Sequence, residues 1–253
     1  MLKKLSYLTA TVLLFSFTSC SESEELLEDD IEVTQQEEEN LASKRDKNGY
    51  LYGSDRTDGF NGSKWWTVYK DGGWGRITFP KGGGNYQLEY KDNKDIVGGK
   101  GWSKGSSTRK MNFQISKQEG SCAFIGAYGW VKLNGKIIEY YVNEMKNKGG
   151  GGTVGGSNKR KDFSSDGRNY RFLTNNRFGP NAYGGSNVSF KQFISEGKSN
   201  VRTGKNYRIS IQNHFNHWKR HGGISGGYGS HLYQVLAVEN FNRKWGRANI
   251  TVW

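Results

Sequence analysis

Two glutamates that lie inside strand-like runs are the residues of this sequence whose surroundings best suit chemistry. Glu139 lies in residues 136–144, and Glu239 lies in residues 232–241. Because side chains alternate between the faces of a strand, each glutamate shares its face with tyrosine and with apolar or amide groups. Burial there raises the pKa of a carboxyl, whereas hydrogen bonds to its anion lower the pKa. Two carboxyls with separated pKa values suit glycoside hydrolysis, although a solvent-facing glutamate on a strand needs no such role.

Few other groupings of residues suggest chemistry. The sequence has no zinc-type spacing of cysteines and histidines, no Gly-x-x-x-x-Gly-Lys-Ser/Thr loop and no Gly-x-Ser-x-Gly elbow. His214, His217 and His221 are spaced to form a metal-binding face. Without further ligands, packing and hydrogen bonding are the favoured roles of His214 and Asn213. Cys122 lies in an apolar run, which favours a buried structural thiol over a nucleophile. We therefore expect no metal and no other cofactor.

The composition indicates an all-β protein. Among 253 residues there are 36 glycines, 2 prolines, 8 tryptophans, 14 tyrosines and 13 phenylalanines. Glycine is costly inside helices while large aromatic residues suit strands, which disfavours a helical protein. The many aromatic residues also disfavour a disordered chain, and the lack of a Gly-X-Y period excludes collagen. From residue 50 onward, short aromatic and β-branched runs alternate with polar turn residues, as in a sandwich or barrel.

These runs define the expected strands and their connections. Asn134-Gly135 lies between two runs and predicts a hairpin with a type I′ turn. Residues 214–221 instead predict a short amphipathic helix that ends before Gly222. Residues 146–161 predict a long loop. The expected strands are 50–52, 85–90, 111–115, 123–131, 137–143, 170–173, 188–194, 207–211, 232–241 and 248–253.

The N-terminal residues predict export and a tether. Residues 1–19 contain two lysines, a mostly apolar stretch and small residues, which is typical of a secretory signal peptide. Cys20 lies where bacterial lipoprotein signals place the lipidated cysteine, although an ordinary signal peptide with an incidental cysteine is the alternative. Residues 20–48 are acidic and predict a disordered tether, and residues 49–253 form the folded domain. Acids after such a cysteine resemble surface-export signals of some Gram-negative bacteria, so we expect a lipid anchor in the cell envelope, with the outer-membrane surface as one location that the sequence allows.

The charge is divided between this N-terminal region and the rest. The whole chain carries a net charge of +13, but residues 1–45 hold ten acids and four bases, which leaves +19 on the remainder. A basic, aromatic-rich body is compatible with a polyanionic partner, either an acidic glycan or a nucleic acid. An exported protein would seldom meet nucleic acid, and the excess charge also serves solubility. The membrane is expected as a partner only through the lipid anchor, and a monomer is expected.

Seven short segments form a recognisable pattern. In chain order they are Val97-Gly-Gly-Lys-Gly-Trp102, Tyr128-Gly-Trp130, Ile138-Glu-Tyr-Tyr-Val142, Ser165-Asp-Gly167, Asn213-His-Phe-Asn-x-Trp218, Tyr233-Gln-Val-x-Ala-Val-Glu239 and Asn249-Ile-Thr-Val-Trp253. From about residue 50 to residue 253, the sequence resembles glycoside hydrolase family 11, the small endo-β-1,4-xylanases. The resemblance implies a β-jelly roll of two curved antiparallel sheets with one short helix. It also implies retaining hydrolysis of internal bonds of xylan by double displacement.

The resemblance also implies roles for individual positions. Glu139 matches the nucleophile and Glu239 the general acid/base, with an expected carboxyl separation of about 5–5.5 Å. Asp95 matches the position beside the acid/base, where an aspartate shares a proton with Glu239, as in family members tuned to acidic pH. The positions expected to bind or orient the sugars are Tyr69, Tyr128, Trp130, Tyr141, Arg177, Pro180, Gln192 and Tyr233.

Three departures from the family pattern concern the substrate. Tyr69 stands where a tryptophan platform is common, and it still offers a ring for stacking on a sugar. The thumb, which closes over the substrate and usually reads Pro-Ser-Ile, here reads Pro180-Asn-Ala-Tyr-Gly184. The Gln-Tyr-Trp-Ser-Val-Arg pattern that follows reads Gln192-Phe-Ile-Ser-Glu-Gly197. These changes leave the chemistry intact and the identity of the glycan open.

Three functions are therefore compared. The leading hypothesis is a cell-envelope endo-β-1,4-xylanase that uses Glu139 and Glu239. A second hypothesis is a related hydrolase of an acidic or modified xylan-like glycan, such as glucuronate-bearing or sulfated xylan, because the body is basic. A third is a non-catalytic surface glycan-binding lipoprotein with Tyr69, Trp130 and Tyr183 as stacking groups, although the presence of both glutamates argues against it.

Overall fold

The computed structural model of the chain describes residues 49–51 and 57–253, which belong to a unit spanning Lys44–Trp253. The predicted signal peptide (1–19), Cys20 and the predicted tether (20–48) lie outside the described residues. Within the described part of the chain, no helix is long and apolar enough to cross a membrane.

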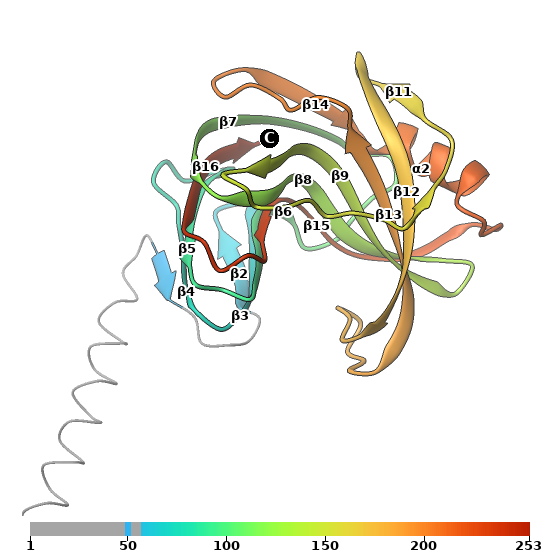
Figure 1. The fold of residues 1–253 in the computed structure, drawn as a ribbon, viewed down its shortest axis with the longest axis horizontal. Helices are drawn as coiled ribbons and strands as arrows, with labels where there is room; N and C mark the ends of the chain where they lie inside the picture. Colours follow the sequence, from blue (N-terminus) through green and yellow to red (C-terminus); the bar gives the residue numbers. More distant parts are fainter. Residues whose placement is uncertain (1–48, 52–56) are drawn as a thin grey trace, which may run out of the picture. The chain divides into compact units, whose positions relative to one another are not determined.

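Two β-sheets form the body of this unit (Figure 1). The six-stranded sheet has the order β1-β4-β5-β16-β7-β14. Its strands are β1 (Gly49–Leu51), β4 (Trp74–Thr78), β5 (Asn85–Lys91), β16 (Gly246–Val252), β7 (Lys110–Gly120) and β14 (Asn206–Ser210).

The second sheet has ten strands, nine of them in the order β10-β12-β13-β9-β8-β15-β6-β3-β2, with β11 paired to β12. Its strands are β2 (Thr57–Asn61), β3 (Lys64–Asp71), β6 (Asp95–Trp102), β8 (Cys122–Leu133), β9 (Lys136–Lys148), β10 (Asn158–Lys159), β11 (Phe163–Ser165), β12 (Arg168–Gly179), β13 (Val188–Gly197) and β15 (Tyr228–Asn240). The one described helix, α2 (Ile211–His221), connects β14 to β15. The predicted all-β architecture of two sheets and one short helix is confirmed.

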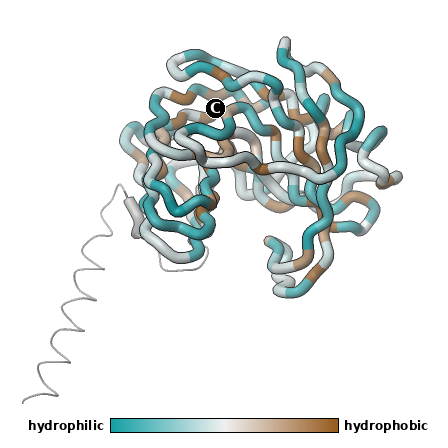
Figure 2. The backbone as a smooth tube through the Cα atoms, viewed as in Figure 1, coloured by the Kyte–Doolittle hydropathy of each residue, from teal (hydrophilic) through white to brown (hydrophobic). Residues whose placement is uncertain are grey.

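Burial patterns distinguish the outer strands from the central ones. Strand β16 alternates between buried and half-buried residues, so only one of its faces is in the core. Figure 2 shows short hydrophobic (brown) and hydrophilic (teal) stretches interspersed along the backbone of this unit. Strands β8 and β9 are buried along most of their length instead. One of their faces packs into the main core, and the other packs into a second hydrophobic cluster that includes Tyr128, Trp130 and Tyr141.

The Asn134-Gly135 hairpin sets the register of these two central strands. Both residues have positive φ angles, +49° and +73°, as the predicted type I′ turn requires. The resulting pairing places Trp130 opposite Glu139 and Tyr128 opposite Tyr141. A local signal in two residues therefore positions side chains that lie on neighbouring strands.

Several predictions of local structure were wrong in detail. Strands β2, β3, β4, β6, β10 and β11 lie outside the predicted runs. The loop predicted for residues 146–161 is shorter, because β9 continues to Lys148 opposite Cys122, and Asn158–Lys159 pairs with β12. The helix begins at Ile211 rather than residue 214. Asp166, from a distant segment, accepts hydrogen bonds from the amide and hydroxyl of Ser210 just before it.

One strand pairing differs from the expected antiparallel pattern. Strands β9 and β13 run parallel, while the other pairings among the described strands are antiparallel. A parallel pair needs a long crossover connection. Residues 149–187, which include β12, provide it, and they thereby bring β13 and its Gln192 beside Glu139.

Glycines in β6 allow that strand to approach β15 closely. A Cβ at Gly99 would collide with the backbone carbonyl of Leu236, which no side-chain movement can relieve. Glycine in a strand marks such a close backbone approach. Because the sequence of β6 is rich in glycine, it does not read as a strand, although it pairs with both β3 and β15.

We predict that Gly99→Ala lowers the free energy of unfolding by about 1–3 kcal/mol, the usual cost of overpacking a tight interior. Denaturant titration followed by tryptophan fluorescence measures the change. Gly227→Ala is the matched control, because a Cβ there meets nothing within 4 Å. Equal midpoints for the two variants would contradict the close approach of β6 to β15.

Candidate active site

A cleft of about 910 Å³ lies over the second hydrophobic cluster on the ten-stranded sheet. Strands β3, β6, β8, β9, β12, β13 and β15 all contribute side chains to its lining. The site residues predicted within the described part of the chain all line this cleft, and they are Tyr69, Asp95, Tyr128, Trp130, Glu139, Tyr141, Arg177, Pro180, Gln192, Tyr233 and Glu239.

Glu139 is a buried carboxylate with its own set of donors. The hydroxyl of Tyr128 donates to its Oε1 at 2.8 Å, and Nε2 of Gln192 donates to its Oε2 at 2.7 Å. These donors are themselves oriented, because Nε1 of Trp130 donates to the Tyr128 oxygen at 3.0 Å and Nδ2 of Asn175 donates to Oε1 of Gln192 at 3.1 Å. Burial raises the pKa of Glu139, and the bonds from Gln192 and Tyr128 counteract that rise.

Glu239 is equally buried, at 7% exposure, but is supported differently. Its Oε2 has no hydrogen-bond partner. Burial raises the pKa of Glu239 well above its usual value, and the nearby carboxyls of Asp95 and Glu139 raise the pKa further. Arg177 and a hydrogen bond with Tyr141 oppose this rise only in part. The protonated form is therefore favoured at Glu239.

Asp95 is the third carboxyl of this group. It begins β6 and lies opposite Asp71 of β3. Burial raises its pKa, and the charges of Glu139 and Asp71 add to the rise, whereas Arg177 lowers it. Because the charge of Asp95 adds to the cost of ionising the buried Glu239, Glu239 retains a proton that a single exposed carboxyl would release.

Burial raises the pKa of both glutamates, but the anion is better compensated at Glu139 than at Glu239. Glu139 has two strong hydrogen-bond donors that stabilise its anion, while Glu239 has an unpartnered oxygen and two carboxyl neighbours. Carboxyls whose environments push their protonation apart can serve as a nucleophile or base and as an acid. The arrangement can therefore protonate a leaving oxygen and supply a carboxylate in the same site.

The aromatic groups of the cleft differ from the predicted stacking set. Tyr69 is 37% exposed and lines the cleft, as a stacking group should. Trp130 is only 4% exposed, and its indole N–H donates to the Tyr128 oxygen. Tyr183 is not part of the lining. Sequence reasoning missed the rings of Phe178 and Phe241, which line the cleft and are 70% and 39% exposed. The alternation that places Phe241 on the face of Glu239 was the available signal for that residue.

The surplus of positive charge is not concentrated in the cleft. Its described lining contains two cationic side chains, Lys94 and Arg177, and three carboxyls, Asp95, Glu139 and Glu239. Electrostatic attraction of a polyanion needs one sign of charge along the cleft. The basic character of the chain therefore does not by itself favour an acidic glycan over a neutral one.

The histidines and the cysteine have structural surroundings. His214 is buried against the rings of Phe163 and Tyr170, and burial lowers its pKa to about 3. Nδ2 of Asn213 donates to Oγ of Ser165 at 3.0 Å. Among residues 58–253, no group of three or more His, Cys, Asp or Glu is placed to hold a metal ion. Cys122 is fully buried, and burial raises the pKa of its thiol to about 12.

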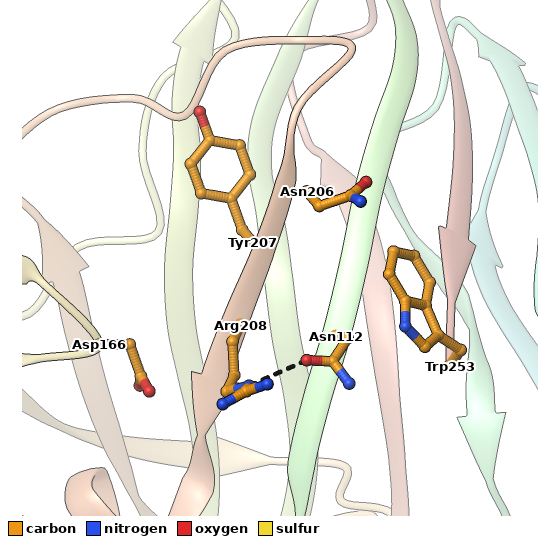
Figure 3. A pocket seen from close by; sticks show the side chains of 6 residues that line it. All are labelled: Asn112, Asp166, Asn206, Tyr207, Arg208 and Trp253. Atoms are coloured by element: carbon orange, nitrogen blue, oxygen red, sulfur yellow. Dashed lines mark hydrogen bonds between the residues drawn. The ribbon is translucent and has the colours of Figure 1, made fainter.

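A second hollow, of about 520 Å³, lies beside β7 and the edge strand β14 of the six-stranded sheet (Figure 3). Asp166 is the one carboxyl among its described lining residues, and it already accepts two hydrogen bonds from Ser210. Nε of Arg208 donates to Oδ1 of Asn112 at 3.0 Å. This hollow lacks a pair of carboxyls, so glycoside chemistry is assigned to the cleft on the ten-stranded sheet.

We predict that Asp95→Asn lowers the pKa of Glu239, because the substitution removes the like charge with the largest effect on that pKa while it keeps the side-chain shape. Titration of the glutamate carboxyls by ¹³C NMR measures the shift. Asp71→Asn is the control, since Asp71 acts on Asp95 but is not among the charges that raise the pKa of Glu239. An unchanged or raised Glu239 pKa in Asp95→Asn would contradict the coupling.

Comparisons with known proteins agree with this geometry. Residues 61–251 match the sequence model of glycosyl hydrolases family 11. Endo-1,4-beta-xylanase A of Schizophyllum commune is 30% identical over 200 residues, which cover 78% of this chain and 95% of that protein. Endo-1,4-beta-xylanase 3 of Pyricularia oryzae is 29% identical over 201 residues, which cover 79% of this chain and 80% of that protein.

A solved structure shares the fold at lower identity. The crystal structure of a loop swap mutant of Necallimastix patriciarum Xyn11A has a TM-score of 0.65 and 21% identity to this chain, covering 81% of this chain and 99% of the other. The family match extends over most of the chain and includes every described residue of the cleft from Tyr69 to Phe241. This protein therefore belongs to glycosyl hydrolases family 11, and it is a glycoside hydrolase with endo-1,4-β-xylanases as its relatives.

Proposed function

We propose that this protein is a retaining endo-β-1,4-xylanase that hydrolyses internal bonds of xylan by double displacement. The observation that carries the proposal is the contrast between the two buried glutamates. Glu139 has donors for its anion, and Glu239 is held toward its protonated form. All of these groups belong to one chain, which supports action as a monomer.

In the first step, Glu239 donates its proton to the glycosidic oxygen while the Glu139 carboxylate attacks the anomeric carbon. The bond to the leaving chain breaks, and a covalent glycosyl–enzyme ester forms at Glu139. In the second step, the ionised Glu239 accepts a proton from water, and that water displaces Glu139. Two inversions at the anomeric carbon retain its configuration.

The surrounding groups support this sequence of steps. The donors Tyr128 and Gln192 fix both oxygens of Glu139, so the attacking carboxylate is oriented before substrate arrives. Burial of the site strengthens these charge-assisted bonds. The half-exposed rings of Tyr69 and Phe241 offer faces on which xylose units can stack.

We predict that Glu239→Gln lowers kcat on linear xylan by about 10²–10⁴-fold, the usual contribution of a general acid/base. We expect Glu139→Gln to cause at least as large a loss. Reducing-end release measures both effects, and NMR of the first product must show the β-anomer. Glu119→Gln is a control glutamate, since its partners Lys117 and Arg247 lie outside the cleft. Full activity of Glu139→Gln, or an initial α-anomer, would overturn the mechanism.

A glycan panel tests the substrate within the same assay. Plain xylan is expected to be hydrolysed, and glucuronate-bearing and sulfated xylans are compared at several salt concentrations. Because the cleft lining mixes cations and carboxyls, we expect no preference for the acidic forms. A rate advantage on acidic xylan that salt abolishes would instead favour the acidic-glycan hydrolase.

We also propose that the protein is exported and anchored in the cell envelope by lipid on Cys20. Support comes from the sequence alone, in which a positive and then apolar segment ends at this cysteine. A multiply acylated cysteine holds a protein at a membrane firmly, whereas one chain contributes only marginal binding.

We predict that Cys20→Ser abolishes incorporation of a fatty-acid label and moves the protein from the membrane fraction to a soluble one. Metabolic labelling and cell fractionation measure these changes. Cys122→Ala is the matched control, because Cys122 is fully buried in the core. Unlabelled wild-type protein, or membrane association that survives in Cys20→Ser, would defeat the proposed anchor.

A further inference from the structure

The loop that connects β12 to β13, residues 180–187, is here called the thumb loop, and it is an ordered turn. The amide and Nδ2 of Asn181 both donate to the carbonyl of Gly185, at 2.9 and 3.2 Å. The amide of Tyr183 donates to Oδ1 of Asn181 at 2.8 Å. An asparagine that binds its neighbouring backbone in this way stabilises a turn. The turn therefore presents the Tyr183 side chain in a defined direction.

Tyr183 reaches from the thumb loop to strands on the far side of β9. Its hydroxyl donates to the carbonyl of Ser230 in β15 at 2.7 Å. Nζ of Lys132 in β8 lies 5.0 Å from the centre of its ring, within the range of a cation–π contact. Strands β9 and β8 lie between β13 and β15 in the sheet. The contact of Tyr183 with Ser230 and Lys132, here called the clasp, thus spans from the thumb loop across β9 to β8 and β15.

The clasp coincides with one end of the cleft. Trp130 lines the cleft and packs against Phe190 of β13, with ring centres 5.1 Å apart. Lys132 lies two residues farther along β8, on the same face as Trp130, but it is not part of the cleft lining, and neither is Tyr183. On either side of Tyr183 in the thumb loop, Ala182 and Gly184 do line the cleft. A sugar ring has no passage between Tyr183 and the two groups that it contacts.

The strand register places the clasp on the side of Glu139. Trp130 is paired with Glu139, whereas Glu239 is paired with Phe124, at the opposite end of β8. In a double displacement the nucleophile binds the sugar whose anomeric carbon reacts, and the acid/base contacts the leaving chain. The clasp therefore closes the part of the cleft that holds the glycone, the non-reducing side of the substrate.

We propose that Tyr183 is a specificity-determining residue that ends the row of glycone subsites. This inference rests on the proposed xylanase function. It adds a limit on the number of sugar units that the cleft binds on the non-reducing side of the scissile bond. An internal stretch of xylan turns away from the floor of the cleft at the clasp. Few sugar units on the non-reducing side of the scissile bond are then held, and binding to the leaving side decides the position of cleavage.

The test measures bond-cleavage frequencies on xylohexaose labelled with ¹⁸O at its reducing end. For wild type we expect cleavage near the non-reducing end. For Tyr183→Ala we expect the main cleavage position to move at least one unit toward the reducing end, because another glycone unit gains room. Tyr183→Phe keeps the ring but loses the hydrogen bond to Ser230, and we expect an intermediate pattern. Tyr207→Phe is the matched control, since its hydroxyl accepts a bond from the amide of Arg202 away from the cleft.

Hydrogen–deuterium exchange of residues 181–187 tests the clasp without any turnover. We expect faster exchange in Tyr183→Phe and Tyr183→Ala than in wild type and in Tyr207→Phe. Unchanged exchange would show that the clasp does not hold the thumb loop. Faster exchange with an unchanged cleavage pattern, or a shift on the leaving side, would overturn the role in substrate length. An inactive wild-type protein would defeat the proposed function instead, and the substrate claim would fall with it.

Discussion

The hydrogen bonds that Tyr128 and Gln192 donate to the buried Glu139 carboxylate are the interaction on which the rest of the site depends. A buried carboxylate is costly unless its anion is compensated. The two donors come from β8 and β13, which flank the strand of the glutamate on either side. The parallel pairing of β9 with β13 places Gln192 directly opposite Glu139. The topology of the sheet thus determines which groups donate hydrogen bonds to Glu139.

This arrangement requires central strands that are buried on both faces. The main core lies on one side of β8 and β9, and the tyrosine-rich cluster beneath the cleft lies on the other. None of the described residues of the six-stranded sheet lines the cleft, but the packing of this sheet covers the apolar face of the strands that carry the two glutamates. Close approach at glycines such as Gly99 lets β6 and β15 pack tightly, and the charge of Asp95 on β6 raises the pKa of Glu239 on β15.

The two ends of the cleft are built differently. At one end, exposed rings such as Phe241 border open solvent, and at the other the clasp of Tyr183 joins the thumb loop to β8 and β15. The thumb loop departs from the family pattern at residues 180–184. In the structure, this departure places Tyr183 in contact with Ser230 and Lys132. A tyrosine at the tip of the turn carries both a ring and a hydroxyl, so it can form two contacts at once.

The amino-acid sequence by itself determined the all-β class, the Asn134-Gly135 hairpin and the two strands that carry Glu139 and Glu239, because turn chemistry and side-chain alternation are local. It did not determine β6, whose glycines read as a loop until β3 and β15 supply partners. Nor did it determine the start of the helix at Ile211, since Asp166 acts there from a distant segment. Only the tertiary structure decided that Trp130 supports Tyr128 rather than a sugar, and that Tyr183 reaches Ser230. The burial of a side chain and its hydrogen-bond partners depend on residues far apart in the chain, so local sequence patterns do not predict them.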